Sequence, residues 1–294
     1  MSGVKENPIK NYLSLVKFSH TIFAMPFAFV GFFIAVKSNS FVFKPETFIL
    51  VLLCMIFARN AAMAFNRYAD REFDKKNPRT AIREIPRGII QPGSALKFVI
   101  LNAFFFIITT WFINRLVFFL SPVALIVILG YSITKRYTAL SHFVLGLGLS
   151  LAPIGAYLAV TGVFNILPLL FSGIVLFWVS GFDIIYAMQD IDFDNNVKLK
   201  SVPVWLGKKN SMLLSVIVHI ISAGFVIIAG FTGNFGILYL TGGIIFISLL
   251  VFQHIIIGPD NLKKVNIAFF TTNGIASIIY SVFTIADLYF HYSF

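Results

Sequence analysis

The chain has 294 residues, of which 58% are hydrophobic and only 12% are charged, and its mean hydropathy is +0.89. These values lie far outside those of soluble domains, so they exclude a single soluble core and indicate a polytopic helical membrane protein. The formal net charge of +11 does not indicate nucleic-acid binding, because the basic residues follow a membrane topology.

Apolar runs long enough to cross a bilayer recur along the whole sequence. No cleavable signal pattern precedes the first run, so we expect it to remain as a helix. No linker or low-complexity segment is evident, so we expect residues 1–294 to form a single transmembrane domain. Only a short polar break at Asn114 and Arg115 separates the third run from the fourth, which leaves eight spans as the alternative to nine. The nine predicted spans cover residues 20–37, 47–68, 96–114, 117–134, 143–161, 166–188, 211–231, 235–257 and 267–289.

Lysine and arginine are concentrated on one side of the predicted membrane. They precede the first span and follow the second, fourth, sixth and eighth spans, whereas the other side has only Lys37, Lys44 and Arg115. The positive-inside rule then places the N-terminus and the ends of the even-numbered spans in the cytoplasm.

Two acidic motifs occupy the cytoplasmic ends of the second and sixth spans. The first contains Asn66, Asp70 and Asp74, and the second contains Asp190 and Asp194. Both aspartate pairs are related by the same offset of 120 residues, which predicts a duplicated four-helix repeat with a ninth helix added. We therefore expect an all-α membrane protein with nine transmembrane helices around a central cavity, and a site at the interface of the repeats.

The spacing within each motif suits a metal site. On a continuous helix, residues at i, i+4 and i+8 lie along one stripe, so hard oxygen ligands would face each other across the cavity. Mg²⁺ prefers such ligands and completes its shell with waters and substrate phosphates. Glu72 and Asp192 lie off these stripes, and we expect them to be solvated or supporting. A bound diphosphate would leave negative charge uncompensated. The adjacent cytoplasmic segments supply cations at Arg79, Arg83, Lys135, Arg136, Lys198 and Lys200.

A cation-coupled transporter is the alternative, because it would also have parallel repeats and carboxylates within the membrane. The acidic motifs lie at span ends beside a basic rim rather than at the midplane, and this favours diphosphate chemistry. His142, His219, His254 and His291 show no ligand spacing, so the sequence assigns them no role.

At the acidic motifs the sequence resembles the UbiA superfamily of intramembrane prenyltransferases, which carries NxxxDxxxD and DxxxD at the cytoplasmic ends of its second and sixth helices. The similarity covers nearly the whole chain and includes residues 17–26, 77–86, 131–136 and 183–190. Residues 17–26 and 183–190 resemble the 4-hydroxybenzoate polyprenyltransferase branch. They also resemble enzymes that prenylate a dihydroxynaphthoate in the futalosine route to menaquinone. Residue chemistry does not separate the two, and we take 4-hydroxybenzoate as the expected acceptor and the dihydroxynaphthoate as the alternative.

The resemblance implies transfer of a polyprenyl group from its diphosphate to a small aromatic acid, at the cytoplasmic face of the bacterial inner membrane. Asp183 or Asp190 would accept a proton, and Lys17 would attract the acceptor's carboxylate. The allylic cation would be shielded by Tyr68, Tyr131 or Tyr186, with Tyr186 preferred. The implied Mg²⁺ ligands are Asn66, Asp70, Asp74, Asp190 and Asp194. The implied diphosphate-binding residues are Arg79, Arg83, Lys135, Lys198 and Lys200.

Overall fold

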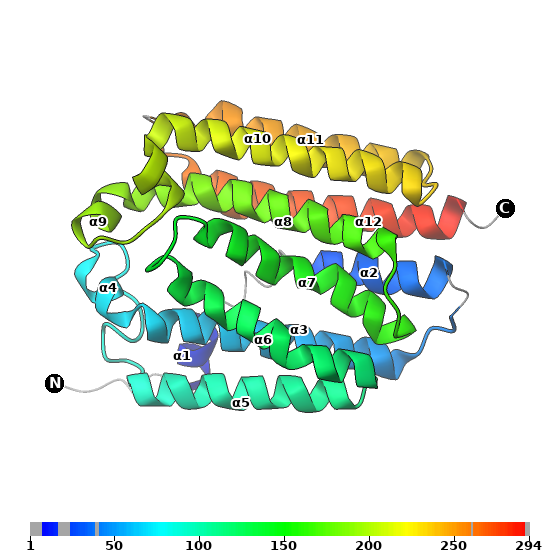
Figure 1. Ribbon diagram of the computed structural model, residues 1–294, viewed down its shortest axis with the longest axis horizontal. Coiled ribbons are helices and arrows are strands. Elements are labelled where there is room, and N and C mark those ends of the chain that lie inside the picture. The colour runs from blue at the N-terminus through cyan, green and yellow to red at the C-terminus, as the bar shows by residue number, and fades with distance from the viewer. Residues whose placement is uncertain (1–7, 17–23, 39–40, 260, 292–294) are drawn as a thin grey trace.

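The computed structural model describes residues 8–16, 24–38, 41–259 and 261–291. These residues form a helical bundle (Figure 1). In chain order the helices are α1 (Pro8–Leu15), α2 (Met25–Ser38), α3 (Pro45–Ala69), α4 (Arg71–Lys76), α5 (Pro92–Trp111), α6 (Arg115–Thr134), α7 (Ser141–Thr161), α8 (Ile166–Ala187), the 3₁₀ turn η2 (Met188–Asp190), α9 (Ile191–Asn196), α10 (Val202–Thr232), α11 (Ile237–Ile256), the π-helix η3 (Ile267–Thr272) and α12 (Asn273–Phe290).

The prediction of an all-α polytopic membrane protein is confirmed. Among the described residues, eight helical segments are long and apolar enough to cross a membrane, and α2 is a shorter apolar helix. The first predicted span begins outside the described residues, so the count of nine stays a prediction. The break at Asn114 does separate two helices, because its side chain accepts a hydrogen bond from the Val117 amide at 2.9 Å and caps α6.

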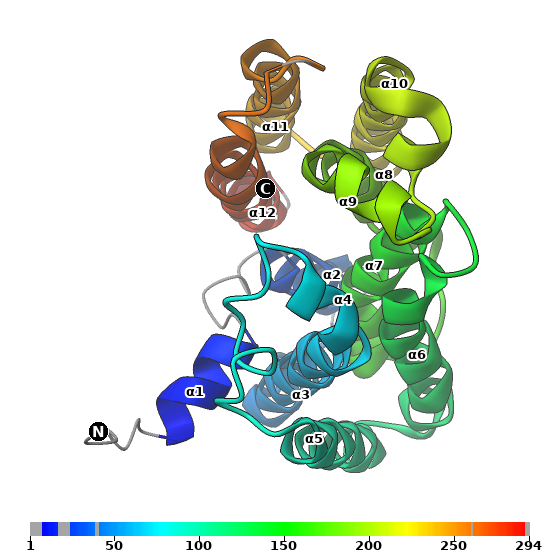
Figure 2. The ribbon, with the colours of Figure 1, turned by 90° about the vertical axis from the view of Figure 1, so that its left-hand side faces the viewer.

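The two halves of the chain repeat the same order of helices. The short helices α4 and α9 span residues 71–76 and 191–196, so their bounds differ by the offset that relates the acidic motifs. In the same register, α2 to α6 correspond to α7 to α11, and α12 is additional. Figure 2 looks along the bundle from the end that carries α1, α4 and α9, so both short helices lie at one end of the bundle.

Close packing joins α7 to α8. A Cβ atom at Gly146 would lie 2.4 Å from both the Leu176 carbonyl oxygen and the Ser180 Oγ, so only glycine allows this approach. On the other side of α8, aromatic rings of α2, α8 and α12 form a buried core, in which Phe27 and Trp178 lie 5.4 Å apart between ring centroids. The buried core fixes α8, and Val179 and Phe182 at the edge of this core also line the cavity described next.

Candidate active site

A cavity of about 1650 Å³ is lined by residues of α3, α6, α7 and α8. Its polar end, here called the cavity mouth, lies where these helices meet α4 and α9. Away from the mouth the lining becomes apolar, with Met55, Ile113, Leu149, Ala152 and Phe164. Such a cavity suits a molecule with an anionic head and an apolar tail. The cavity mouth is defined by Asn66, Asp70, Asp74, Asp190 and Asp194.

Each acidic motif bends at its first aspartate. Asp70 follows the end of α3 with φ −90° and ψ 5°, and Asp190 precedes α9 with φ −103° and ψ 7°. The expectation of one continuous helix is therefore wrong, because Asp74 and Asp194 lie on the separate short helices α4 and α9, but the residues of both motifs still line one cavity. The first bend is mild, since the Asp74 amide still donates to the Asp70 carbonyl at 2.8 Å.

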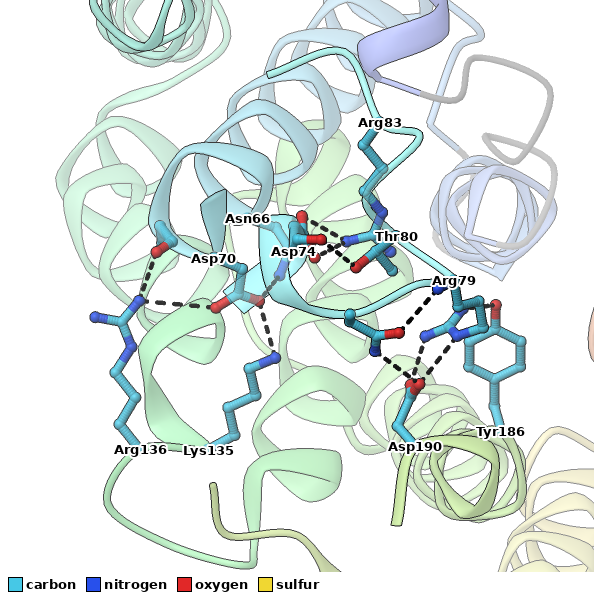
Figure 3. Close-up of polar contacts among 12 residues, drawn as sticks. Asn66, Asp70, Asp74, Arg79, Thr80, Arg83, Lys135, Arg136, Tyr186 and Asp190 are labelled. Carbon is cyan, nitrogen blue, oxygen red and sulfur yellow. Dashed lines mark hydrogen bonds and ion pairs between the residues drawn. The ribbon is translucent and has the colours of Figure 1, made fainter. Parts of the chain in front are cut away.

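The carboxylates of the first motif are paired with cations (Figure 3). Arg83 Nη1 donates to Asp74 Oδ1 and Oδ2 at 2.6 and 2.8 Å. Lys135 Nζ lies 3.0 Å from Asp70 Oδ2, and Arg136 Nη2 lies 3.7 Å from Asp70 Oδ1. That Oδ1 atom is buried and has no hydrogen-bond partner among the described residues. A buried carboxylate oxygen left in this way has room for a further cationic partner.

Arg79 connects the first motif to the second. Its Nε donates to Asp190 Oδ1 at 3.0 Å, its Nη2 contacts Asp190 Oδ2, and its Nη1 donates to the Tyr186 hydroxyl at 3.0 Å. Asn77 Nδ2 also donates to Asp190 Oδ1, at 3.2 Å. Burial lowers the pKa of the Arg79 guanidinium, but the hydrogen bonds and charge of Asp190 outweigh burial and raise this pKa above its ordinary value. Both acidic motifs thus belong to one site.

Aromatic residues form a wall beside this network. Tyr186 packs against Phe269 of η3 with ring centroids 4.1 Å apart, and both line the cavity together with Phe270. Tyr131 also lines the cavity, whereas Tyr68 does not and instead stacks beneath Arg71. Phe269 and Phe270 could not be predicted as part of the site, because nothing local in the sequence links a π-helix so far along the chain to the acidic motifs.

The structure does not bring every predicted cation to the cavity. Lys198 and Lys200 are exposed and are not among the cavity-lining residues, and Lys200 Nζ donates to the Tyr137 carbonyl at 3.0 Å. Lys17 lies outside the described residues, so its contact with the acceptor stays a prediction. Glu72 and Asp192 are exposed, as their position off the stripes indicates.

Three further polar residues line the cavity or support it. His142, to which the sequence assigned no role, has its Nδ1 2.7 Å from Asp183 Oδ2. Arg59 and Arg67 lie on α3 and also line the cavity. The Nε of Arg67 is buried without a hydrogen-bond partner among the described residues. The role of Arg59 could have been expected from the sequence, because it is a charged residue inside a predicted span and such charges usually mark a functional site.

The donor set at the mouth fits Mg²⁺. Among the described residues no group of three or more His, Cys, Asp or Glu side chains is placed to hold a metal ion. Mg²⁺ does not need one, because it binds through one or two carboxylates and takes its remaining ligands from water and substrate phosphates. The buried Asp70 Oδ1 supplies an oxygen of the required kind.

The fold and the site define a polytopic membrane protein with a charged cavity mouth and an apolar cavity behind it. Within that class, the chain belongs to the UbiA prenyltransferase family, because the sequence model of this family matches residues 24–275. The family decides between the two functions considered from the sequence, in favour of the prenyltransferase and against the transporter.

Relatives and solved structures agree with this membership. The chain is 30% identical over 242 residues to a 4-hydroxybenzoate octaprenyltransferase of Photobacterium profundum, covering 80% of this chain and 83% of the relative. It is 28% identical over 234 residues to the enzyme of that name from Tolumonas auensis, covering 79% and 82%. A UbiA homologue from Aeropyrum pernix K1 superposes with a TM-score of 0.83 at 28% identity, covering 92% of this chain and 98% of that one. A UbiA homologue from Archaeoglobus fulgidus, bound to DMAPP and Mg²⁺, shares the fold with a TM-score of 0.76 at 21% identity, covering 95% and 99%.

Proposed function

We propose that this protein transfers a polyprenyl group from a polyprenyl diphosphate to 4-hydroxybenzoate, with Mg²⁺ as cofactor, for quinone biosynthesis. The observation that carries the proposal is the joining of both acidic motifs by Arg79 at the mouth of an apolar cavity. The names of the relatives support the choice of acceptor.

The diphosphate would bind at the cavity mouth, where carboxylates and cations alternate. Arg79, Arg83 and Lys135 now neutralise Asp190, Asp74 and Asp70. With substrate and Mg²⁺ bound, these cations would contact phosphate oxygens, and the carboxylates would hold the metal. Mg²⁺ would stabilise the negative charge that develops on the departing diphosphate oxygen. The basic residues around the mouth support a cytoplasmic orientation.

The prenyl tail would lie along the apolar lining between α3, α6 and α7. Gly155 on α7 lines this part of the cavity, and a Cβ atom there would meet nothing within 4 Å. The wall of Tyr186 and Phe269 stands beside the mouth, where the allylic carbon would carry positive charge after the C–O bond breaks. The π faces of these rings would stabilise that charge.

The acceptor would lie deeper, with its carboxylate on Arg59 and its hydroxyl toward Asp183. Both residues line the same cavity, Arg59 from α3 and Asp183 from α8. A para-hydroxy acid carries its carboxylate and its hydroxyl at opposite ends of the ring, so it could contact a cation with one end and a carboxylate with the other. This orientation presents the ring carbon beside the hydroxyl to the allylic carbon.

One assay tests the proposal. Membranes containing the protein are incubated with radiolabelled octaprenyl diphosphate, Mg²⁺ and either 4-hydroxybenzoate or a dihydroxynaphthoate, and the lipid extract is analysed for a labelled aromatic product. The proposal expects product with 4-hydroxybenzoate, and none when EDTA replaces Mg²⁺. Product with the dihydroxynaphthoate alone would move the enzyme to the menaquinone route, and product with neither would contradict the aromatic acceptor.

A further inference from the structure

We infer that His142 is a positioning residue. It holds the Asp183 carboxylate in place, and this carboxylate takes the phenolic proton of 4-hydroxybenzoate. This inference rests on the proposed function. Its structural basis is a buried contact between two helices: His142 belongs to the first turn of α7, Asp183 belongs to α8, and His142 Nδ1 lies 2.7 Å from Asp183 Oδ2.

The surroundings of His142 fix which ring nitrogen carries the proton. The Val202 amide, at 3.4 Å, donates to His142 Nε2. Val202 is the first residue of α10, so its N–H is one of those that a helix leaves without an intrahelical acceptor. Because Nε2 accepts this bond, the proton of the neutral imidazole is on Nδ1 and is donated to Asp183.

The contact is rigid on the side of His142 and open on the side of Asp183. His142 is buried, its carbonyl accepts a hydrogen bond from Ser180 Oγ at 3.3 Å, and Gly146 one turn later allows α7 to approach α8 closely. The Asp183 side chain remains 21% exposed and lines the cavity. One carboxylate oxygen is therefore held by the imidazole while the residue still faces the space where the ring would bind.

The geometry favours Asp183 over Asp190 as the proton acceptor. Asp190 already accepts hydrogen bonds from Arg79 and Asn77 at the cavity mouth. Asp183 lies on α8, seven residues before Asp190, which ends the 3₁₀ turn η2. The Asp183 carboxylate contacts the imidazole of His142, whereas the Asp190 carboxylate contacts the diphosphate-binding cation Arg79.

The chemistry balances with groups that the reaction supplies. The C–O bond of the allylic diphosphate breaks and its electron pair leaves with the diphosphate, while the ring carbon beside the hydroxyl forms a bond to the allylic carbon. The phenolic proton moves to Asp183, which removes the positive charge from the ring and leaves a dienone. The proton on the alkylated ring carbon is then lost to the departing diphosphate, and Asp183 returns its proton to the oxygen as the ring becomes aromatic again.

The test compares variants with two acceptors, 4-hydroxybenzoate and 3-fluoro-4-hydroxybenzoate, whose phenol is more acidic and which keeps one free ring position beside the hydroxyl. We expect Asp183→Asn to lower kcat about a hundredfold with 4-hydroxybenzoate. His142→Ala should lower it about tenfold or more, with little change in KM for the polyprenyl diphosphate. His142→Gln should recover most of this loss, because its amide can donate to Asp183. The matched control is His219→Gln, since His219 is a buried histidine that does not line the cavity.

Comparing the loss of kcat with 4-hydroxybenzoate to the loss with 3-fluoro-4-hydroxybenzoate separates a proton-transfer role from a packing role. If Asp183 takes the phenolic proton, the losses in Asp183→Asn and His142→Ala will be several-fold smaller with the fluorinated acceptor. Equal losses with both acceptors, unchanged kcat in His142→Ala, or a Gln variant as impaired as the Ala variant would each overturn the inference. A wild-type enzyme inactive with every aromatic acceptor would instead contradict the proposed function itself.

Discussion

Arg79 and Asp190 are 111 residues apart in sequence, yet Arg79 Nε donates to Asp190 Oδ1 at 3.0 Å (Figure 3). The arginine follows the first acidic motif, and the aspartate belongs to the second. The pair therefore joins the two repeats of the fold at the cavity mouth. Because Arg79 pairs with Asp190 here, a diphosphate bound at this site would have to compete with a carboxylate for the same guanidinium.

Arg79→Ala should raise the KM for the polyprenyl diphosphate about tenfold or more, because charge-assisted hydrogen bonds contribute about 1.5–3 kcal/mol. The KM of Arg79→Lys should lie between the KM of Arg79→Ala and that of the wild type, since lysine keeps the charge but loses the fork geometry. Arg71→Ala is the control, because Arg71 stacks on Tyr68 and does not line the cavity. Steady-state kinetics with varied diphosphate check this, and an unchanged KM in Arg79→Ala would remove Arg79 from the diphosphate site.

Asp70→Asn and Asp190→Asn should each reduce turnover by at least about a hundredfold, because each removes a negatively charged ligand of the Mg²⁺ that would stabilise the charge on the departing diphosphate. Both should also raise the Mg²⁺ concentration needed for half-maximal activity. Glu72→Gln and Asp192→Asn are matched controls, since these acidic residues are neighbours of the motifs but are exposed. Mg²⁺ titrations of all four variants make the comparison, and equal behaviour of motif and control variants would argue against a metal at the mouth.

Arg59→Leu should raise the KM for 4-hydroxybenzoate far more than the KM for the polyprenyl diphosphate. The reason is that Arg59 lies two helical turns deeper than Arg67, within the predicted span, where a carboxylate has few other cations to contact. Replacing the acceptor by its methyl ester should abolish the difference between wild type and variant. If wild type and Arg59→Leu have the same KM for 4-hydroxybenzoate as well as the same KM for its methyl ester, then Arg59 does not bind the acceptor's carboxylate.

The fold and the two acidic motifs that line the cavity could be predicted from the sequence because their signals are local or periodic. Hydropathy gives the spans, and the repeated spacing of Asp70 to Asp74 and Asp190 to Asp194 gives the duplication. The bends at Asp70 and Asp190 could not be predicted, since the spacing of the side chains is the same whether a helix continues or turns at an aspartate.

Contacts made by tertiary packing were also beyond the sequence. His142 reaches Asp183 because Gly146 brings α7 close to α8, and nothing in the spacing of histidines signals that approach. Lys198 and Lys200 failed to reach the cavity for a related reason. The backbone at Lys198 has φ 58°, and the turn leaves both lysines exposed, so nearness in sequence to Asp194 did not predict direction.

Asp287→Ala should destabilise the fold without changing the chemistry. The buried carboxylate accepts hydrogen bonds from the amides of Gly236, Leu238 and Tyr239 at 2.6, 3.1 and 3.1 Å, so it caps the start of α11 from α12. Leaving these amides without their acceptor should cost about 1–3 kcal/mol. A thermal melt in detergent should show a lower Tm. The kcat per folded molecule should stay at the wild-type value, because Asp287 belongs to the last turn of α12 and α12 ends at the side of the bundle opposite α4 and α9 (Figure 1). A fall in kcat at full stability would contradict a purely structural role.

Gly155→Leu should shift the preference of the enzyme toward shorter prenyl donors. A side chain at this position would point into open space within the cavity, so it would occupy room proposed for the tail rather than clash with protein. Turnover with octaprenyl diphosphate should fall about tenfold relative to turnover with geranyl diphosphate, because the longer chain loses apolar contacts at the rate of about 0.8 kcal/mol for each methylene displaced. Gly224→Leu is the control, since its Cβ also meets nothing within 4 Å but Gly224 does not line the cavity. Measuring both donors with both variants separates the two effects: a Gly155→Leu enzyme that uses long and short donors in the wild-type ratio would place the tail elsewhere.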